Sequence, residues 1–404
     1  MGVLGSKKCI DLFAGCGGLS LGLHLSGWKG VFAIEKSPFA FETLRYNLIE
    51  NKKHFDWPGW LECKEHDIYE VLQNHKEQLK SLQGEIDLVV GGPPCQGFSM
   101  AGKRVEDDIR NRLVYSYIEF IELVKPKLIL LENVKGFTYA FKKKNNDDET
   151  TPVPYSKIVI DKLKSLGYDV KAQIMDFSDY GVPQRRKRFI LVGSLNENAA
   201  DFVKKIDEKR EKFLKGKKLN KTTTVAEAIS DLQQSNGIIP CPDRKGFFAG
   251  IYSSVNSNFQ ELMRKDKTKE NVIPDSHSFA HHSTETIRVF SNLLSLYPYK
   301  NKKIGNKERE KWDIKKRGIT ILDGEGVSPT LTTHPDDYIH YSEPRILTVR
   351  EYARIQTFPD WYEIKKKYTT GGNLRKVEVP RYTQIGNAIP PLFAELAGLA
   401  LKEM

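Results

Sequence analysis

The stretch IDLVVGGPPCQGFS spans residues 86–99 and joins a short apolar run to a loop rich in glycine and proline. The run 86–90 predicts a buried strand, and the two glycines and two prolines after it predict an abrupt end and a loop of nearly fixed shape. Cys95 lies in that loop, just beyond the carboxyl end of the strand, where open α/β sheets collect ligands and chemistry. The alternative is a small buried thiol without chemistry, which is what most lone cysteines are.

The half of the chain around this loop alternates expected strands with expected helices. The strands are residues 8–13, 30–34, 86–90, 127–131, 170–177 and 188–192, and the helices are residues 19–25, 112–124, 155–166 and one that begins at Pro38. This alternation predicts an α/β fold with a mostly parallel, doubly wound sheet and helices on both faces. After Gly193 the alternation stops, and we expect a domain boundary near Ser194.

The composition is that of an ordinary globular protein. With 404 residues, 39% hydrophobic and 28% charged, the chain can form two domains, and no apolar run reaches transmembrane length. The start of the chain has no signal-peptide core. The five cysteines are an odd number without a Cys-x-x-Cys pair, which argues against a disulfide framework and a structural zinc site and favours a reducing cytoplasm.

The positive charge is concentrated in two stretches of the middle region. Residues 201–221 hold nine Lys or Arg against four Asp or Glu, and residues 299–317 hold nine against three, so together they supply the whole net charge of +11. One such stretch alone is usually a solvated face. Two such basic stretches in one candidate domain favour a surface that binds the phosphates of a nucleic acid.

A glycine turn follows the first expected strand, at Gly15-Cys16-Gly17-Gly18. Glycines there let backbone N–H groups approach a ligand at a helix N-terminus. Glu35 ends the next strand 20 residues after Gly15, which is the spacing expected for a carboxylate that binds ribose hydroxyls. Because the glycines are not spaced as Gly-x-Gly-x-x-Gly, a nucleoside-type cofactor is favoured over a dinucleotide. The alternative is tight helix–strand packing.

Five motifs occur in a fixed order along the chain: DLFAGCGG at 11–18, PPC at 93–95, ENV at 132–134, QRRKR at 184–188 and QIGN at 384–387. Together they resemble the DNA (cytosine-5)-methyltransferase family of the bacterial restriction-modification type. The resemblance covers both ends of the chain and fails in the middle, at residues 195–343. It implies a class I S-adenosylmethionine-dependent, Rossmann-like fold with a smaller target-recognition domain. It also implies methyl transfer from S-adenosylmethionine to C5 of a flipped-out cytosine within a short DNA sequence.

The resemblance assigns the catalytic residues one by one. Cys95 is the nucleophile that adds to cytosine C6, a covalent route that divides one difficult step into easier ones. Glu132 is expected to stabilise the ring at N3, although a carboxylate at a strand end can also cap a helix. Arg188 is assigned to the target cytosine and Arg186 to the catalytic loop or a phosphate, with Gln184 completing the pattern Gln-x-Arg-x-Arg.

Further residues are expected to bind the cofactor or DNA. The expected cofactor-binding residues are Phe13, Ala14, Gly15, Gly17, Gly18, Glu35, Asp67, Ile68, Pro93 and Asn387. The expected DNA-binding residues are Gln96, Ser99, Arg186 and Thr330. Lys36 departs from the family, which often has a bulky apolar residue there beside the adenine.

We expect a discontinuous domain organisation. Residues 1–194 with 382–404 would form the catalytic and cofactor-binding domain, residues 195–344 the target-recognition domain, and residues 345–381 a hinge with a helix that links the two. In that link Thr348 predicts a helix N-cap, with Glu351 three residues later completing a capping box. The segment at residues 362–382 is longer than we expect between the last two motifs, and the sequence suggests no role for it.

The expected partner is double-stranded DNA, with a cognate restriction endonuclease as a functional partner only. We expect a cytoplasmic, nucleoid-associated monomer that does not bind a membrane. His277, His281 and His282 have the spacing of metal ligands, but no Cys or second His pair completes a site, so no metal is expected. Two alternatives remain open: a tRNA cytosine-C5 methyltransferase of the same fold, and a catalytically silent nucleic-acid-binding module.

Overall fold

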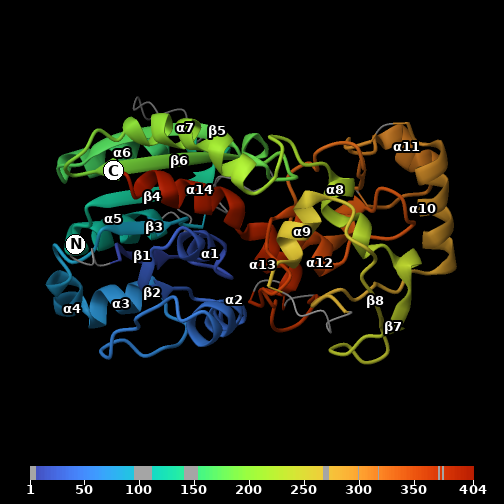
Figure 1. Ribbon diagram of the computed structural model, residues 1–404, viewed down its shortest axis with the longest axis horizontal. Coiled ribbons are helices and arrows are strands. Elements are labelled where there is room, and N and C mark those ends of the chain that lie inside the picture. The colour runs from blue at the N-terminus through green and yellow to red at the C-terminus, as the bar shows by residue number, and fades with distance from the viewer. Residues whose placement is uncertain are drawn as a thin grey trace, which may run out of the picture. The chain divides into compact units, whose positions relative to one another are not determined.

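The computed structural model describes residues 6–94, 112–140, 153–266, 273–298, 300–316, 318–371, 374 and 377–404 (Figure 1). These residues pack into two compact units. The first unit contains Met1–Asp176, Lys187–Arg210 and Ala394–Met404, and the second contains Phe177–Arg186 and Glu211–Phe393. Each unit is described here by itself. No helix within the described ranges is both long and apolar enough to cross a membrane.

A six-stranded sheet with the order β2-β1-β3-β4-β6-β5 organises the first unit. Its strands are β1 (Lys8–Leu12), β2 (Lys29–Ile34), β3 (Leu88–Gly91), β4 (Leu128–Val134), β5 (Asp169–Asp176) and β6 (Lys187–Ser194). Strands β2, β1, β3 and β4 are parallel to one another, whereas β6 runs antiparallel to both of its neighbours, β4 and β5. The mostly parallel sheet predicted from the sequence is therefore confirmed.

Helices cover both faces of this sheet. The helices of the first unit are α1 (Gly18–Leu25), α2 (Pro38–Leu44), which continues as a π-helix (Arg45–Asn51), α3 (Ile68–Asn74), α4 (Lys76–Ser81), α5 (Arg112–Val124) and α6 (Tyr155–Ser165). Side chains of α3, α5 and α6 join Ile10 and Leu12 of β1 in one apolar core. On the other face α1 and the C-terminal helix α14 (Pro391–Leu401) pack closely, since a Cβ added to Gly22 would lie 2.3 Å from that of Ala394. The division between the units falls within α14 and within α7 (Asp201–Gly216).

Strand β4 is longer than the sequence indicated. We expected a strand that ends at Glu132, but β4 continues to Val134. The reason is its antiparallel partner: Glu132 pairs with Ile190 and Val134 pairs with Arg188 in β6. Glu132 therefore projects from within the sheet, and the ladder fixes its direction.

The second unit has little regular structure for its length. Its helices are α8 (Val225–Ile229), α9 (Asn258–Arg264), α10 (Thr284–Leu296), α11 (Asn306–Lys311), α12 (Val349–Ile355) and α13 (Arg381–Asn387). Its strands are β7 (Ile238–Pro240) paired with β8 (Phe248–Gly250), and β9 (Thr320–Ile321) paired with β10 (Tyr338–Ile339). A small apolar core gathers side chains of α10, β9 and β10.

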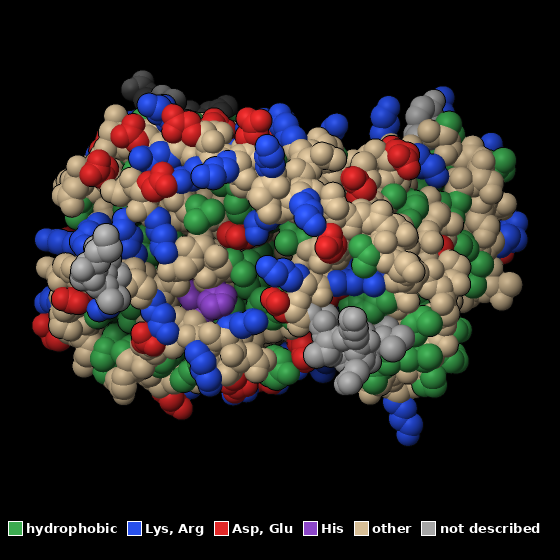
Figure 2. Space-filling model, viewed as in Figure 1, with side chains coloured by type: hydrophobic (Ala, Val, Ile, Leu, Met, Phe, Trp, Pro, Cys, Tyr) green, Lys and Arg blue, Asp and Glu red, His purple; other side chains and the backbone are tan. Residues whose placement is uncertain are grey.

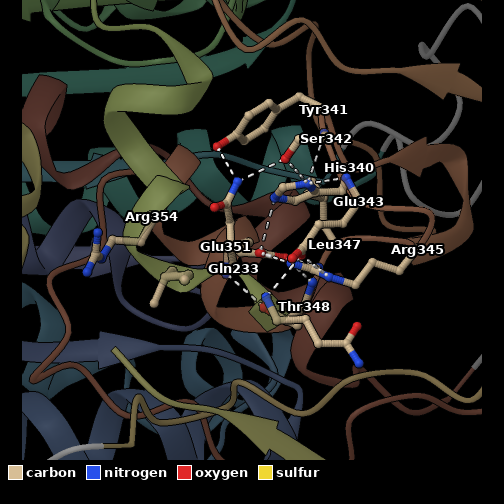
Figure 3. Close-up of polar contacts among 12 residues, drawn as sticks. Gln233, His340, Tyr341, Ser342, Glu343, Arg345, Leu347, Thr348, Glu351 and Arg354 are labelled. Carbon is tan, nitrogen blue, oxygen red and sulfur yellow. Dashed lines mark hydrogen bonds and ion pairs between the residues drawn. The ribbon is translucent and has the colours of Figure 1, made fainter. Parts of the chain in front are cut away.

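Buried polar contacts hold the irregular backbone of the second unit. The capping box predicted at α12 is confirmed, with the Thr348 and Glu351 side chains accepting each other's backbone N–H. Arg345 donates two hydrogen bonds, of 2.8 and 2.7 Å, to the carboxylate of Glu351 (Figure 3). Glu343 in turn accepts the backbone N–H groups of Gln234 and Ser235. Because Arg345 also pairs with Glu343, these contacts tie α12 to residues 234–235, which are distant in sequence.

The packing units are not identical to the functional domains expected from the sequence. Residues 345–381 and 382–393 belong to the second packing unit, as does the short segment Phe177–Arg186. The functional division into residues 1–194 with 382–404, 195–344 and 345–381 stays a prediction.

Candidate active site

The carboxyl ends of the parallel strands place Glu132 and several of the expected cofactor residues along one edge of the first unit. Strand β3 ends at Gly91, where a Cβ would lie 2.7 Å from the carbonyl oxygen of Leu12, so a larger residue would push β3 away from β1. The side-chain amide of Asn133 donates a 3.2 Å hydrogen bond to the carbonyl oxygen of Pro93. The start of the Pro-Pro loop is therefore fixed to β4, the strand that carries Glu132.

Glu132 and Arg188 meet at this edge. Arg188 Nε lies 2.8 Å from Glu132 Oε1, and the two side chains are only 12% and 13% exposed, respectively. A Cβ on Gly92 would lie 3.0 Å from Glu132 Oε2, so the glycine keeps the space beside the carboxylate open. The structure thus brings together a carboxylate and a guanidinium that the sequence places 56 residues apart (188 − 132). An ion pair this well shielded keeps both groups at defined positions beside the loop.

The glycine turn forms a second part of the edge. Phe13, Gly15 and Gly17 all have positive φ angles, of 59°, 57° and 88°, so the chain turns sharply between β1 and α1. The Gly15 N–H donates to Glu35 Oε2 at 2.9 Å, and the Ser37 N–H donates to Glu35 Oε1 at 2.7 Å. A Cβ on Gly15 would meet nothing within 4 Å, which leaves open space above the turn.

The Glu35 carboxyl group is therefore positioned by backbone on both sides. Burial raises its pKa above the ordinary value, and the N–H groups of Ser37 and Gly15 oppose that rise. Of the other expected cofactor residues, Ala14 and Ile68 are buried and Gly18 is the first residue of α1. Carboxylate, backbone N–H groups and open space are what a ribose-bearing ligand needs.

Asp67 lies at the start of α3, where one carboxylate oxygen accepts the N–H of Tyr69. The other oxygen lies 2.6 Å from Lys36 Nζ. Lys36 is 79% exposed, so this ion pair lies at the surface of the unit. The residue at which the sequence departs from the family pattern therefore contacts a residue expected to bind the cofactor.

Sequence reasoning missed Asp11. This carboxylate is buried behind the glycine turn and accepts a 2.5 Å hydrogen bond from the Ser20 hydroxyl in α1. Burial raises the pKa of Asp11 to about 7, with Glu35 contributing in the same direction. The pair joins β1 to α1 directly below the turn. The signal was available, because a charged residue within an apolar strand needs a buried partner.

The remaining cationic motif is divided between the units. Arg188 belongs to the first unit, while Gln184 and Arg186 are buried in the second. Arg186 Nη2 donates to the carbonyl oxygen of Gly386 at 3.0 Å, and Gln184 Oε1 accepts the N–H of Leu331 at 2.9 Å. These contacts give both side chains a positioning role inside the second unit. Their expected catalytic roles, and the phosphate contact of Arg186, stay predictions.

Gln356 is a second residue that sequence reasoning missed. It accepts a 2.6 Å hydrogen bond from Gln184 Nε2 and donates to the carbonyl oxygens of Ile385 and Ala388. It therefore joins the motifs at 184–188 and 384–387 through one buried side chain. A glutamine just after the amphipathic helix 349–355 gave no signal of this, because its partners are distant in sequence.

The surroundings of Thr330 and Asn387 do not indicate which ligand either residue binds. The hydroxyl of Thr330 donates to the carbonyl oxygen of Arg185 at 2.6 Å, and Asn387 is exposed at the end of α13 in the second unit. Their roles toward DNA and cofactor stay predictions. Cys95, Gln96 and Ser99 lie outside the residues that the structure describes.

Of the three histidines considered as metal ligands, His277 and His281 have other partners. His277 is buried, with Nδ1 2.8 Å from the Thr348 hydroxyl and Nε2 2.9 Å from the Leu232 carbonyl oxygen. His281 stacks on Phe247, with ring centroids 4.1 Å apart. Over the parts of the chain that the structure describes, no group of three His, Cys, Asp or Glu side chains could hold a metal ion.

Comparisons with known proteins bear on the family and the fold of this chain. The family model described as C-5 cytosine-specific DNA methylase matches residues 7–403. Type II methyltransferase M.PspPI of Psychrobacter sp. is 32% identical over 409 residues, covering 99% of this chain and 80% of its own. Type II methyltransferase M.DdeI of Desulfomicrobium norvegicum is 29% identical over 406 residues, covering 96% and 86%.

Among solved structures, one described as a prophage-encoded DNA modification methyltransferase (E. coli) is similar with a TM-score of 0.67 and 24% identity. The similarity covers 98% of this chain and 99% of that one. It supports the fold across both units.

Proposed function

We propose, from the premise that this chain belongs to the C-5 cytosine-specific DNA methylase family, that it methylates one cytosine within a short sequence of duplex DNA through a covalent bond to Cys95. DNA cytosine-5 methylation with S-adenosylmethionine as methyl donor follows from the family. The covalent step, the flipped base and the single target sequence are the parts we propose. The observation that carries them is the shielded Glu132–Arg188 ion pair beside the Pro-Pro loop.

The residues of the glycine turn fit S-adenosylmethionine. The open space above Gly15 and the Glu35 carboxylate at its margin suit a nucleoside whose ribose hydroxyls donate to that carboxylate. Phe13, Gly17, Asp67, Ile68, Pro93 and Asn387 are the further residues assigned to this ligand. When bound, S-adenosylmethionine supplies an electrophilic methyl group.

Cys95 would activate the cytosine by adding its thiolate to the ring. C5 of an aromatic pyrimidine is a poor nucleophile, and addition of the Cys95 thiolate to C6 moves the electron pair of the C5–C6 bond toward C5. After C5 has gained the methyl group, loss of the C5 proton and departure of the thiolate restore the aromatic ring. The carbon–sulfur bond formed at C6 is thereby broken again, and the thiolate is restored. The prolines at 93 and 94 restrict the loop that directs the sulfur.

Glu132 and Arg188 would hold the target base during this addition. Negative charge develops on the ring as the thiolate adds, and a proton held by Glu132 at N3 would stabilise it. Arg188 keeps the carboxylate in place and offers further N–H donors to the carbonyl oxygen of the base. Because neighbouring bases cover both faces of a cytosine in a duplex, the target must leave the stack, which costs a few kcal/mol.

The names of the relatives favour a modification enzyme. Type II methyltransferases are the proteins to which this chain is similar over nearly its whole length. We infer that it protects DNA against a cognate restriction endonuclease, which would share its target sequence without binding to it. A nucleoid-associated monomer in the cytoplasm suits this role, because one active site acts on one flipped base.

The test is to incubate the protein with S-adenosylmethionine and mixed bacterial DNA, with tRNA in a parallel tube, and to map 5-methylcytosine by sequencing. We expect methylation at one short motif in DNA, and no methylation by the Cys95→Ala variant despite an unchanged melting temperature. Methylation of tRNA alone would replace the DNA substrate with RNA. A fully active Cys95→Ala protein would contradict the covalent mechanism.

A further inference from the structure

We infer that Arg244 reads a guanine of the DNA target, by donating two hydrogen bonds to the guanine O6 and N7 atoms in the major groove. This inference rests on the proposed function, because it assumes a duplex DNA substrate. It adds one base contact in a region where the sequence motifs name none. Charge alone does not locate such a contact, since Lys and Arg side chains are spread over the visible face among Asp and Glu (Figure 2).

Arg244 lies in the turn of the β7–β8 hairpin, which is yellow-green in Figure 1. The turn is closed by hydrogen bonds from the Cys241 N–H to the Phe247 carbonyl oxygen, 2.8 Å, and from the Phe247 N–H to the Arg244 carbonyl oxygen, 3.2 Å. Its neighbours Lys245 and Gly246 are exposed. A two-stranded ribbon with a short turn has the width of the major groove of DNA.

Aromatic rings position the Arg244 guanidinium. Its central carbon lies 3.5 Å from the centroid of the Phe247 ring and 4.9 Å from that of Tyr368. His281 stacks on Phe247, with ring centroids 4.1 Å apart. A guanidinium stacked in this way loses little further freedom when it binds a ligand, and its N–H edge remains available.

The donors of Arg244 are not used by the residues that the structure describes. Its side chain makes no hydrogen bond or ion pair to any of them, although Asp243 is the next residue in the chain. Asp243 is occupied by Arg381 Nη1 at 2.6 Å and by the Tyr368 hydroxyl at 2.8 Å. The Asp243 carboxylate therefore holds Arg381 and Tyr368 in place and does not neutralise the Arg244 guanidinium.

Tyr368 gives residues 362–382 a role that the sequence did not suggest. Its ring contacts a second cation besides Arg244, with the Arg381 guanidinium carbon 4.1 Å from the centroid. Arg381 is held in turn by the Lys366 carbonyl oxygen at 2.7 Å and the Ser276 hydroxyl at 2.9 Å. The segment thus builds a rigid support for one half-buried arginine, which is more than surface solubility requires.

Guanine is the base that this geometry favours. A planar guanidinium with two parallel N–H groups matches O6 and N7 of guanine, and a single lysine ammonium does not reproduce that match. Phe248, 49% exposed at the start of β8, offers an apolar surface in the same hairpin that suits a thymine methyl group. Phosphate binding would need no such fixed orientation.

The experiment compares full-length wild type with Arg244→Lys, Arg244→Ala and Lys245→Ala, the last being the adjacent exposed cation. Wild type is first used to map the methylated motif, which tests the proposed function independently. Methylation rates are then measured on the mapped duplex and on duplexes with each single base pair replaced. For both Arg244 variants we expect kcat/KM on the mapped duplex to fall about 5- to 150-fold, with discrimination lost at one G·C pair alone.

The Lys245→Ala control should lower kcat/KM slightly and equally on all duplexes, as expected for a phosphate contact. The inference is overturned if the Arg244 variants lose activity uniformly over all duplexes, or lose none. Melting temperatures equal to that of wild type exclude unfolding as the cause. A Phe247→Leu variant should lose part of the same discrimination, because the arginine then lacks its stacking partner.

Discussion

The two units hold their side chains in position by different physical means. In the first unit a backbone ladder of six strands positions side chains, and its interior is mostly apolar. In the second unit the strands have only two or three residues, and three arginines rank among its largest fully buried side chains: Arg186, Arg350 and Arg354. Irregular backbone leaves many carbonyl groups without a ladder partner, and buried arginines supply the missing donors.

This difference predicts how each unit responds to substitution. Removing a charge at the edge of the sheet leaves the ladder intact, so activity should fall while stability remains. Removing one partner of an ion pair that has no exposed surface, unlike the partly exposed Glu132–Arg188 pair, leaves an uncompensated charge in the interior, so stability should fall.

The largest effect is expected from Glu132→Gln in the first unit. The amide keeps the shape but cannot supply the same proton at N3, so kcat should fall about 10²- to 10⁴-fold. Because β4 is fixed by its partner strands, the melting temperature should remain within a few degrees of wild type. The matched control is Glu122→Gln, an exposed residue on α5, which should leave kcat unchanged. A variant that is inactive because it unfolds would contradict the assignment of Glu132 to chemistry.

A smaller effect, on stability, is expected from Asp360→Asn in the second unit. Asp360 is fully buried and accepts hydrogen bonds from Arg354 Nε, 2.5 Å, Arg354 Nη2, 2.6 Å, and the Tyr252 hydroxyl, 2.6 Å. The arginines lower the pKa of the Asp360 carboxyl against the effect of burial. Loss of one partner from such a pair costs about 3–5 kcal/mol, so we expect the free energy of unfolding of Asp360→Asn to fall by about that amount. Urea denaturation of the variant and the wild type measures this difference.

The control for Asp360 is the exposed pair Arg288–Glu285 on α10. Because solvent screens that pair, Arg288→Ala should give an unchanged denaturation midpoint. If Asp360→Asn also leaves the midpoint unchanged, the buried charges do not hold the second unit together, and the contrast between the units fails.

The same contrast explains what could be predicted from the sequence. Alternating strands and glycine turns follow local rules, so the sheet, the turn at Gly15 and the position of Glu35 were predictable. Glu132 was found by its motif, but its place within β4 depends on antiparallel pairing with β6, which local pattern does not encode. Class I fold and family followed from motif order, and the comparisons confirm both.

Contacts in the second unit between residues distant in sequence were not predictable, unlike the local capping box at α12, and the reason is physical. Arg354 binds Asp231, 123 residues earlier, and Arg244 stacks on Tyr368, 124 residues later (368 − 244). A charged residue in an irregular segment is usually solvated, and only its tertiary environment distinguishes the buried cases. The catalytic loop itself stays a prediction, because Cys95 lies outside the described residues.

The smallest effect concerns acid stability, which both units should share. Burial lowers the pKa of His54 in the first unit and of His277 in the second to about 3 each. In the unfolded chain these histidines bind protons near their ordinary pKa of about 6.5. Because the unfolded state then holds more protons, the free energy of unfolding should fall as the pH decreases from about 6.5 toward 3.

The measurement is urea denaturation at pH 7.5 and 5.5 for wild type, His54→Leu and His277→Gln. Each substitution removes one titrating group, so the difference in unfolding free energy between the two pH values should shrink in both variants. Asp11 acts in the opposite direction, because its pKa is raised to about 7 and the folded state then retains a proton as the pH rises. It is present in all three proteins and cancels in the comparison. A loss at low pH that is identical in wild type and both variants would show that neither histidine is kept neutral by burial, in either unit.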